Sequence, residues 1–298
     1  MPKPKTMFLF KVATLSGLCG LFIMLQTGCS TIHSPPIVEN DTGIHHLGKF
    51  VWHDLLTSDV AATKTFYGQL FNWVFEQHDR YTLISVDNKH IGGIVYSPED
   101  SSSRHAAHWL SFLSVPDVDQ AIDVVTANGG TVLKGPETIK GRGRVASISD
   151  PQGARLSLIF TQNSEPNDES IAEGAWLWHE LWTNNPSDSA KFYEALVGYS
   201  TVEIFDDYWV LSNDNKWQAG VRNLFNKSLK QRWVPVVKVN DVKAISTRAK
   251  HLGGKVIIAP ENPDFVDQIA LLADPLGALF IIQEWSGEDD SEEGEKQE

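Results

Sequence analysis

The chain has 298 residues, and 42% of them are hydrophobic, which is enough to build two separate cores. Its formal net charge of −13 at pH 7 argues against a nucleic-acid partner, because binding to phosphates needs a basic surface. The only cysteines are Cys19 and Cys29, both near the N-terminus. Neither a disulfide nor a cysteine-based active site is therefore expected in the body of the protein.

The first 29 residues have the pattern of a targeting segment. Three lysines precede an apolar run of 14 residues, from Val12 to Leu25, and this part of the chain has no acidic residue. A run of this length is too short to span a bilayer, but it fits the core of a signal peptide. An ordinary secretory signal or a retained anchor helix is the simplest interpretation if no lipid is attached.

The end of this segment, LQTGC, resembles a bacterial lipobox, in which Cys29 becomes the acylated N-terminus. The lipobox pattern prefers leucine where Gln26 stands, so the match is not complete. The resemblance implies a protein anchored in the bacterial cell envelope, since each buried methylene of an acyl chain contributes ~0.8 kcal/mol. Ser30 after the cysteine resembles sorting to the outer membrane, with the protein facing the periplasm.

The rest of the chain divides by composition into two domains and their connections. Residues 30–46 are expected to be a polar tether and residues 163–174 a linker between the domains. The predicted domains are residues 47–162 and 175–286. Residues 287–298 are rich in acidic side chains and are expected to be a disordered, solvated tail.

One stretch occurs twice, and it organises the whole chain. Six of its residues recur 126 positions later, a fixed offset that indicates internal duplication. The pairs are Trp52 and Trp178, His53 and His179, Leu55 and Leu181, Thr57 and Thr183, Phe66 and Phe192, and Tyr67 and Tyr193.

Each copy is predicted to be a strand, then a helix, then a strand. Asp59 and Asn185 follow the first strands and suit the N-cap position of a helix. Neighbours in a strand point to opposite faces, so Trp52 shares a face with Asp54, while His53 lies on the other face. The helix is expected to cover the face that carries His53.

A second duplication lies inside each half. Residues 115–136 match residues 239–260, and residues 148–159 match residues 272–283, both 124 positions apart. The capped helix ending in Phe-Tyr, the Val-x-Asp-Val helix start, the Gly-Gly pair and the closing Asp-Pro-x-Gly together resemble the vicinal oxygen chelate superfamily. That superfamily includes glyoxalase I, bleomycin-resistance proteins and extradiol dioxygenases.

This resemblance implies an α+β fold of two tandem domains. Each domain would contain two βαβββ modules, whose curled mixed sheets surround a cavity. The two domains would pair on each other as an internal pseudo-dimer, as separate chains do in this superfamily.

Metal enzymes of the superfamily take His and Glu ligands from the first strand of each module and from the strand after Asp-Pro-x-Gly. At these positions the chain has Trp52, Trp178, Ser157 and Ile281. Indole and aliphatic side chains do not bind divalent metals, so no metal cofactor is expected.

A divalent metal at a non-standard site is the alternative. His53 or Asp54 could combine with His108 to bind it, because imidazole and carboxylate are both metal ligands. Against this, a lone strand histidine is more often a packed or hydrogen-bonded core residue. His53 also points away from Asp54 within the strand.

The expected cavity face does place an acid beside an indole. Asp54 follows Trp52 by two positions, and Glu180 follows Trp178 in the same way. A carboxylate on an apolar face is costly unless it is paired, so these acids are candidates for ligand binding or for a general base. Trp109, on a neighbouring strand, is expected to join Trp52. A purely structural hydrogen bond to either acid is the simpler interpretation.

The basic loop from Lys140 to Arg144 could hold an anion over the first cavity, although a solvated loop is the simpler interpretation. The sequence therefore favours an envelope-anchored, glyoxalase-like protein that binds a small apolar or aromatic molecule in a domain cavity. The alternatives are a metal-dependent lyase or dioxygenase with a non-standard site, and a metal-free acid–base catalyst using Asp54 or Glu180.

Overall fold

The computed structural model describes residues 34–38, 41–98, 107–167, 171–205, 208–224, 229–260 and 269–285. The predicted signal segment with Cys29 and the acidic tail lie outside the described residues.

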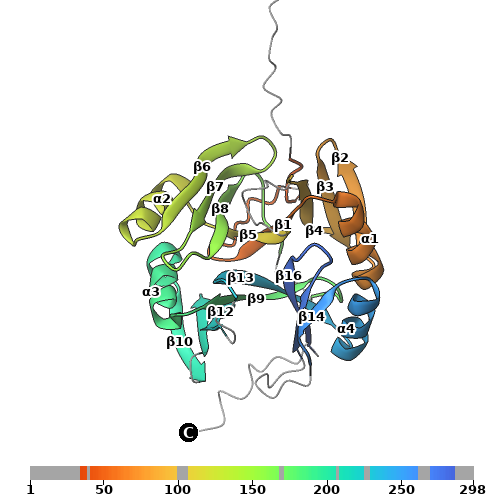
Figure 1. Cartoon of the computed structure of the whole chain (residues 1–298). Coiled ribbons are helices and arrows are strands. Elements are labelled where there is room, and N and C mark those ends of the chain that lie inside the picture. Colours follow the sequence, from red (N-terminus) through yellow and green to blue (C-terminus); the bar gives the residue numbers. More distant parts are fainter. Residues whose placement is uncertain are drawn as a thin grey trace, which may run out of the picture. The chain divides into compact units, whose positions relative to one another are not determined.

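The first half is one eight-stranded mixed sheet with two helices (Figure 1). The strands lie in the order β2-β3-β4-β1-β5-β8-β7-β6, so β1 and β5, the first strands of the two modules, are neighbours at the centre. The elements are β1 (Phe50–Thr57), α1 (Val60–Phe71), β2 (Val74–His78), β3 (Tyr81–Val86), β4 (Lys89–Tyr96), β5 (His108–Ser114), α2 (Val118–Ala127), β6 (Thr131–Ile139), β7 (Gly143–Ser149) and β8 (Arg155–Thr161).

The second half repeats this topology, with strand order β10-β11-β12-β9-β13-β16-β15-β14. The predicted α+β fold with two tandem pairs of βαβββ modules is therefore confirmed. Its elements are β9 (Trp176–Thr183), α3 (Pro186–Val197), β10 (Ser200–Phe205), β11 (Tyr208–Asn213), β12 (Lys216–Asn223), β13 (Arg232–Val239), α4 (Val242–His251), β14 (Lys255–Ile258), β15 (Ile269–Ala273) and β16 (Leu279–Glu284).

The helices begin where the sequence predicts. The Asp59 carboxylate accepts a hydrogen bond from the backbone of Ala62 at 2.9 Å, and the Asn185 side chain accepts one from Asp188 at 3.2 Å. Each bond satisfies an amide of the first helical turn that has no partner within the helix. Pro186 occupies the first turn of α3, where its missing N–H is not needed.

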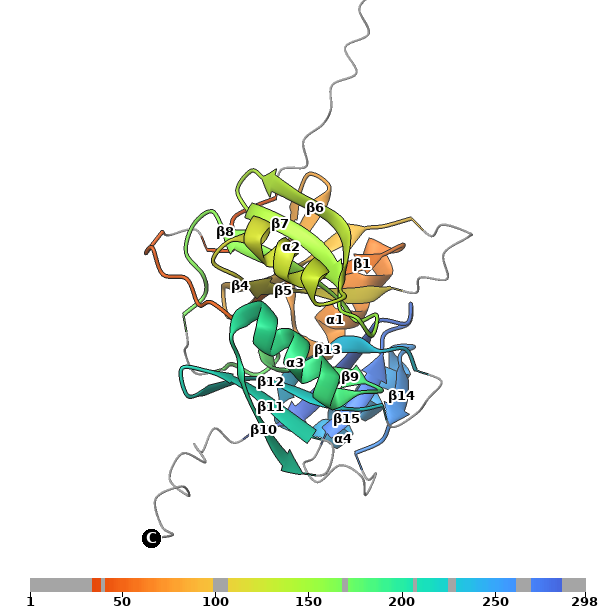
Figure 2. The same ribbon diagram turned by 90° about the vertical axis from the view of Figure 1, so that its left-hand side faces the viewer.

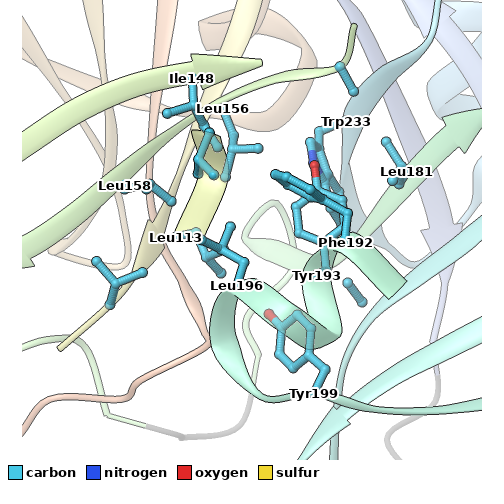
Figure 3. Close-up of a cluster of buried hydrophobic side chains, with 14 of the residues drawn as sticks. Leu113, Ile148, Leu156, Leu158, Leu181, Phe192, Tyr193, Leu196, Tyr199 and Trp233 are labelled. Carbon is cyan, nitrogen blue, oxygen red and sulfur yellow. The ribbon is translucent and has the colours of Figure 1, made fainter. Parts of the chain in front are cut away.

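Each sheet has one face covered by its helices and one that is not, here called the helix-free face. As predicted, Trp52 and Asp54 lie on the helix-free face of the first half, and Leu55 packs with Phe66 of α1 on the other. The clusters on the helix-bearing faces contain side chains from both halves. Figure 2 shows α2 stacked above α3, and Figure 3 shows Leu113 and Leu156 of the first half close to Leu196 of the second.

The segment expected to be a polar tether is folded in its described part. Ser34 and Ile37 are only 8% and 4% exposed, and His45 stacks on Phe160 with ring centroids 4.7 Å apart. The start of the expected linker is folded as well, since Glu165 is 2% exposed and accepts a hydrogen bond from the backbone of His46. Composition indicated solvated connections here, but the two segments are held by each other and by the first sheet.

Candidate ligand site

Asp54 is the centre of a buried polar set on the helix-free face of the first half. Its Oδ1 accepts hydrogen bonds from Trp52 Nε1 at 2.8 Å and from the Tyr81 hydroxyl at 2.5 Å. Arg142 Nη2 donates to the same hydroxyl at 2.8 Å, and the guanidinium lies 4.5 Å from the centre of the Trp52 ring. Burial raises the pKa of Asp54, while Arg142 and the two hydrogen bonds oppose that rise.

Glu180 occupies the equivalent position in the second half. Its Oε2 accepts a hydrogen bond from Trp182 Nε1 at 2.8 Å, and its Oε1 accepts one from the Tyr208 hydroxyl at 3.4 Å. Arg222 Nη1 lies 3.6 Å from Oε2, and the guanidinium is 5.1 Å from the centre of the Tyr208 ring. The two halves therefore share an acid, a tyrosine, an indole and an arginine, although the arginine comes from a different element in each.

A glycine in each half lets the tyrosine reach the acid. Gly93 pairs with the acid position on β1, and a Cβ atom there would lie 1.9 Å from the Tyr81 hydroxyl oxygen. Gly220 pairs with the acid position on β9, and its Cβ would lie 2.3 Å from the Tyr208 hydroxyl oxygen. The strand next to each acid thus has no side chain where the phenol crosses it, because a methyl group there would exclude the ring.

The two sets differ in their access to solvent. Trp52 and Arg142 are 0% and 2% exposed. In the second half the Arg222 side chain is 24% exposed and Trp178 is half-buried. Trp178 faces Trp217, which is 62% exposed, with ring centroids 6.5 Å apart. The second half therefore presents accessible aromatic and charged groups beside its acid, whereas Trp52 and Arg142 beside the acid of the first half are buried.

Trp109 does not lie beside Trp52, and that expectation was wrong. It pairs with Leu55 across β1 and β5, which places it on the helix-bearing face. Its indole donates a hydrogen bond to the Tyr67 hydroxyl at 3.2 Å. The error came from the register between the two strands, because the position of Trp109 within β5 does not by itself fix which residue of β1 it faces.

The repeated Phe-Tyr and Asp-Pro-x-Gly motifs meet across the two halves. The Tyr193 hydroxyl donates to Asp150 Oδ2 at 3.3 Å and accepts a hydrogen bond from Trp233 Nε1 at 2.8 Å. Asp150 Oδ1 accepts from the backbone of Ala154 at 2.8 Å, which holds the turn of its motif. Burial raises the pKa of both Tyr193 and Asp150. These motifs therefore join the halves and do not reach the helix-free faces.

His53 and His179 form a stacked pair between the sheets. Their ring centroids lie 4.7 Å apart, their Nε2 atoms are in hydrogen-bond contact, and both residues are at most 6% exposed. Burial lowers the pKa of His53 to about 3 and places the pKa of His179 well below its ordinary value. Both rings are therefore neutral at pH 7, and the Nε2–H of one ring donates a hydrogen bond to Nε2 of the other.

Comparison with known proteins agrees with this architecture. Residues 43–158 match the model of the Glyoxalase/Bleomycin resistance protein/Dioxygenase superfamily. The chain is 30% identical over 242 residues to the "Putative glyoxylase CFP32" of Mycobacterium tuberculosis, covering 78% of this chain and 92% of the relative. The chain belongs to this superfamily.

Other members resemble it more distantly. The "Anthracycline biosynthesis protein DnrV" of Streptomyces peucetius is 27% identical over 259 residues, covering 80% of this chain and 93% of the relative. The Mn(II)-bound glyoxalase from Novosphingobium aromaticivorans has the same fold, with a TM-score of 0.56 and 15% identity over 80% of this chain and 82% of its own.

The superfamily's metal ligands do not fit the positions that this member offers. The Trp52 indole is a hydrogen-bond donor to Asp54, and the Ser157 hydroxyl pairs with Ser147 at 2.9 Å. Ile281 packs in an apolar cluster of the second half. Within the described residues, no three His, Cys, Asp or Glu side chains lie close enough to hold a metal ion.

His53 and His108 cannot bind one metal ion together. His108 pairs with Leu56 across β1 and β5 and so belongs to the helix-free face. His53 lies on the other face, against His179. Since the sheet separates them, a non-standard site that combines these two histidines is wrong, whereas Asp54 and His108 lie on the same face and that combination stays a prediction.

Sequence reasoning missed four members of the two sets, namely Tyr81, Arg142, Tyr208 and Arg222. A signal for the tyrosines was present, because they begin a segment that recurs 127 positions later, Tyr81 to Lys89 and Tyr208 to Lys216. The basic loop gave a signal for Arg142, but it was expected to be solvated, and the structure buries this side chain against Trp52.

Proposed function

We propose that this member of the superfamily binds a small aromatic molecule with a polar substituent on the helix-free face of its second half, without a metal ion. The contrast between the halves carries the proposal. Both acids are buried, Asp54 at 8% and Glu180 at 7% exposed, but the first half also buries Trp52 and Arg142, whereas the second half leaves Trp178, Trp217 and Arg222 partly accessible.

The chemistry of the second set defines the ligand class. Glu180 is held by Trp182 and Tyr208, so its carboxylate is fixed in position before a ligand arrives. A hydroxyl or amine on the ligand can donate to this carboxylate, while Arg222 can donate to an acceptor group. Trp178 and Trp217 supply the aromatic surface, which contributes about 0.5–1.5 kcal/mol per ring pair beyond the burial of area.

The relatives add limited support. One is named as a glyoxylase and another for anthracycline biosynthesis, and anthracyclines are polycyclic aromatic compounds. Neither name identifies the ligand of this chain. They do agree with a site for small organic molecules in this superfamily.

The duplication provides a matched control for the test. Glu180→Gln keeps the shape of the side chain and removes its charge, and Asp54→Asn makes the same change in the buried set of the first half. Binding of 1-naphthol, measured by calorimetry, should weaken about 10–150-fold in Glu180→Gln, the 1.5–3 kcal/mol scale of a hydrogen bond to a charged group. Asp54→Asn should leave the affinity unchanged.

Other outcomes have distinct meanings. Unchanged affinity in Glu180→Gln would show that the probe binds without using the Glu180 set, and an equal loss in both variants would show that the effect is not specific to the second half; either result would refute the proposal. Metal analysis of the purified protein, followed by calorimetric titration with Mn²⁺ and Zn²⁺, tests the alternative of a metal-dependent lyase or dioxygenase. Stoichiometric binding of either metal that Glu180→Gln abolishes would favour that alternative.

We also propose that Cys29 carries a lipid that anchors the protein in the bacterial envelope. The support is the apolar run that ends in LQTGC. Within the described part of the chain, no helix is long and apolar enough to cross a membrane. Cys29→Ser should abolish metabolic labelling with a radioactive fatty acid and move the protein from the detergent phase to the aqueous phase. Unchanged labelling and unchanged partitioning would contradict the proposal.

A further inference from the structure

Residues Ser34–Val38, here called the strap, cover the helix-free face of the first half. Ile37 is 4% exposed and belongs to the same apolar cluster as Trp52, Tyr81 and Phe112. Val38 packs against this cluster as well. The complete burial of the Asp54 set therefore depends partly on a segment that belongs to neither βαβββ module.

The strap is held differently from the residues that follow it. Residues 41–46 are fastened by hydrogen bonds to Ser164 and Glu165, for example Thr42 Oγ1 to Ser164 Oγ at 2.9 Å. Among the described residues, the strap itself has a single side-chain hydrogen bond, from Asn163 Nδ2 to the Val38 carbonyl at 3.4 Å. Its attachment is therefore mostly apolar, and residues 41–46 can stay in place when it lifts.

The group beneath the strap has an unused donor. Arg142 is 2% exposed, and its Nη1 has no hydrogen-bond partner among the described residues. Its Nη2 donates to Tyr81, and the guanidinium lies between the Trp52 and Tyr81 rings at 4.5 Å and 5.3 Å from their centres. A buried, unpaired N–H beside aromatic rings is costly in the closed state, and it fits the acceptor group of an aromatic ligand.

In the second half, the described segment before the first strand does not form such a cover, although Leu224 and Leu229, between β12 and β13, pack against its helix-free cluster. The residues that lead into its first strand take another course, since Gly174 accepts a hydrogen bond from Trp73 Nε1 at 2.8 Å and Ala175 accepts one from the backbone of Lys238 at 2.9 Å. Closure by a preceding segment is therefore a property of the first half.

We propose that the strap is an internal, displaceable occupant of a second ligand site, and that this site takes a small aromatic carboxylate, with Arg142 Nη1 as the donor to the carboxylate. Ile37 fills the place of the aromatic ring while the strap is down. The inference concerns the first half alone and does not depend on the site proposed in the second half.

Displacement can be tested on the unaltered protein, with benzoate as the probe. Saturating benzoate should raise the hydrogen-exchange rate of the Ile37 and Val38 amides at least threefold, because the ligand and the strap compete for one place. Exchange in β1 and β5 should stay the same or slow. A strap with a purely structural role would show unchanged or slower exchange, and that result would overturn the proposal.

A pair of variants gives an independent test. Ile37→Ser weakens the docking of the strap, while Ile44→Ser changes an exposed isoleucine just beyond it, 44% accessible, and serves as the control. Benzoate affinity, measured by calorimetry, should rise at least tenfold in Ile37→Ser and stay unchanged in Ile44→Ser. Adding Arg142→Met to Ile37→Ser should remove the gain.

The same benzoate titrations can also refute the proposal. A gain of affinity that survives Arg142→Met would refute the assigned donor. No gain in a folded Ile37→Ser variant would show that the strap does not compete with the ligand. The gain in benzoate affinity of Ile37→Ser could also be removed by Glu180→Gln and not by Arg142→Met. The benzoate would then bind in the second half, and the inference about the first half would fail independently of the site proposed in the second half.

Discussion

The buried histidine pair should make the protein less stable in mild acid. The pKa of His53 is about 3 in the folded protein, against 6.5 for an exposed histidine. Between these two values the unfolded chain binds a proton that the folded chain does not, so stability falls as the pH decreases from about 6.5 towards 3. Above pH 6.5 neither the folded nor the unfolded chain binds this proton, so the stability no longer changes with pH through the histidine pair.

The size of the effect follows from the same two values. For His53 alone, the free energy of unfolding should fall by about 2 kcal/mol between pH 8 and pH 5. His179 acts in the same direction, since its pKa is also lowered by burial. Urea unfolding at pH 8 and pH 5 measures this loss in the wild type and in a His53→Leu/His179→Leu variant, in which the loss should shrink by at least 2 kcal/mol.

A control isolates the pair from other titrating groups. His251 is exposed on α4, so His251→Gln should keep the pH dependence of the wild type. Carboxylates titrate equally in all three proteins, and their contribution cancels in the comparison. If the double variant loses as much stability between pH 8 and pH 5 as the wild type, the histidines are not the source and the reasoning from their burial is refuted.

Two further changes test packing that the structure makes explicit. Gly93→Ala should lower the free energy of unfolding by about 1–3 kcal/mol, the usual cost of overpacking, because the new methyl group collides with the Tyr81 hydroxyl. Urea unfolding measures this loss of stability. An unchanged unfolding midpoint would contradict the close approach of Gly93 and Tyr81. Tyr193→Phe should lower the free energy of unfolding by about 1–3 kcal/mol, because the buried Trp233 indole loses its hydrogen-bond acceptor. Tyr96→Phe, at a position that is 59% exposed, is the control and should not change the stability measurably.

The fold could be predicted because its signals are local and repeated. The six identities at one offset, the N-cap residues Asp59 and Asn185 and the alternation along β1 are all properties of neighbouring residues. Each was enough to place a strand or a helix and to decide which face the helix covers. The register between strands is not a local property, and Trp109 was assigned to the wrong face for that reason.

The candidate site was harder to predict, because its members come together only through long-range packing. Asp54 was found from its position beside an indole, but Tyr81 reaches it over Gly93, and Arg142 reaches the Tyr81 hydroxyl from the turn before β7. The strap was missed for a related reason. Two prolines and several polar residues indicate a solvated segment, and nothing in the composition shows that Ile37 fills a space on the sheet.

The duplication also shows which face the two halves have kept in common. Five of the six repeated residues, His53, Leu55, Thr57, Phe66 and Tyr67, are buried on the helix-bearing side, whereas the sixth, Trp52, lies on the helix-free face. Even the hydroxyl contact from the strand to the helix is repeated, as Thr57 to Thr63 in one half and as Thr183 to Ser189 in the other, both at 3.0 Å.

The helix-free faces keep Trp52 and Trp178, and Tyr81 and Tyr208, as identical pairs, but their charged groups differ. The acid is an aspartate in one half and a glutamate in the other, and its arginine comes from the loop before β7 in the first half and from β12 in the second. Packing between two halves constrains both partners at once, whereas each helix-free face can change alone. Most of the repeated strand and helix identities therefore mark the surface where the halves meet, and the helix-free faces differ chiefly in their charged groups: Arg142 beneath the strap and Arg222 beside Glu180.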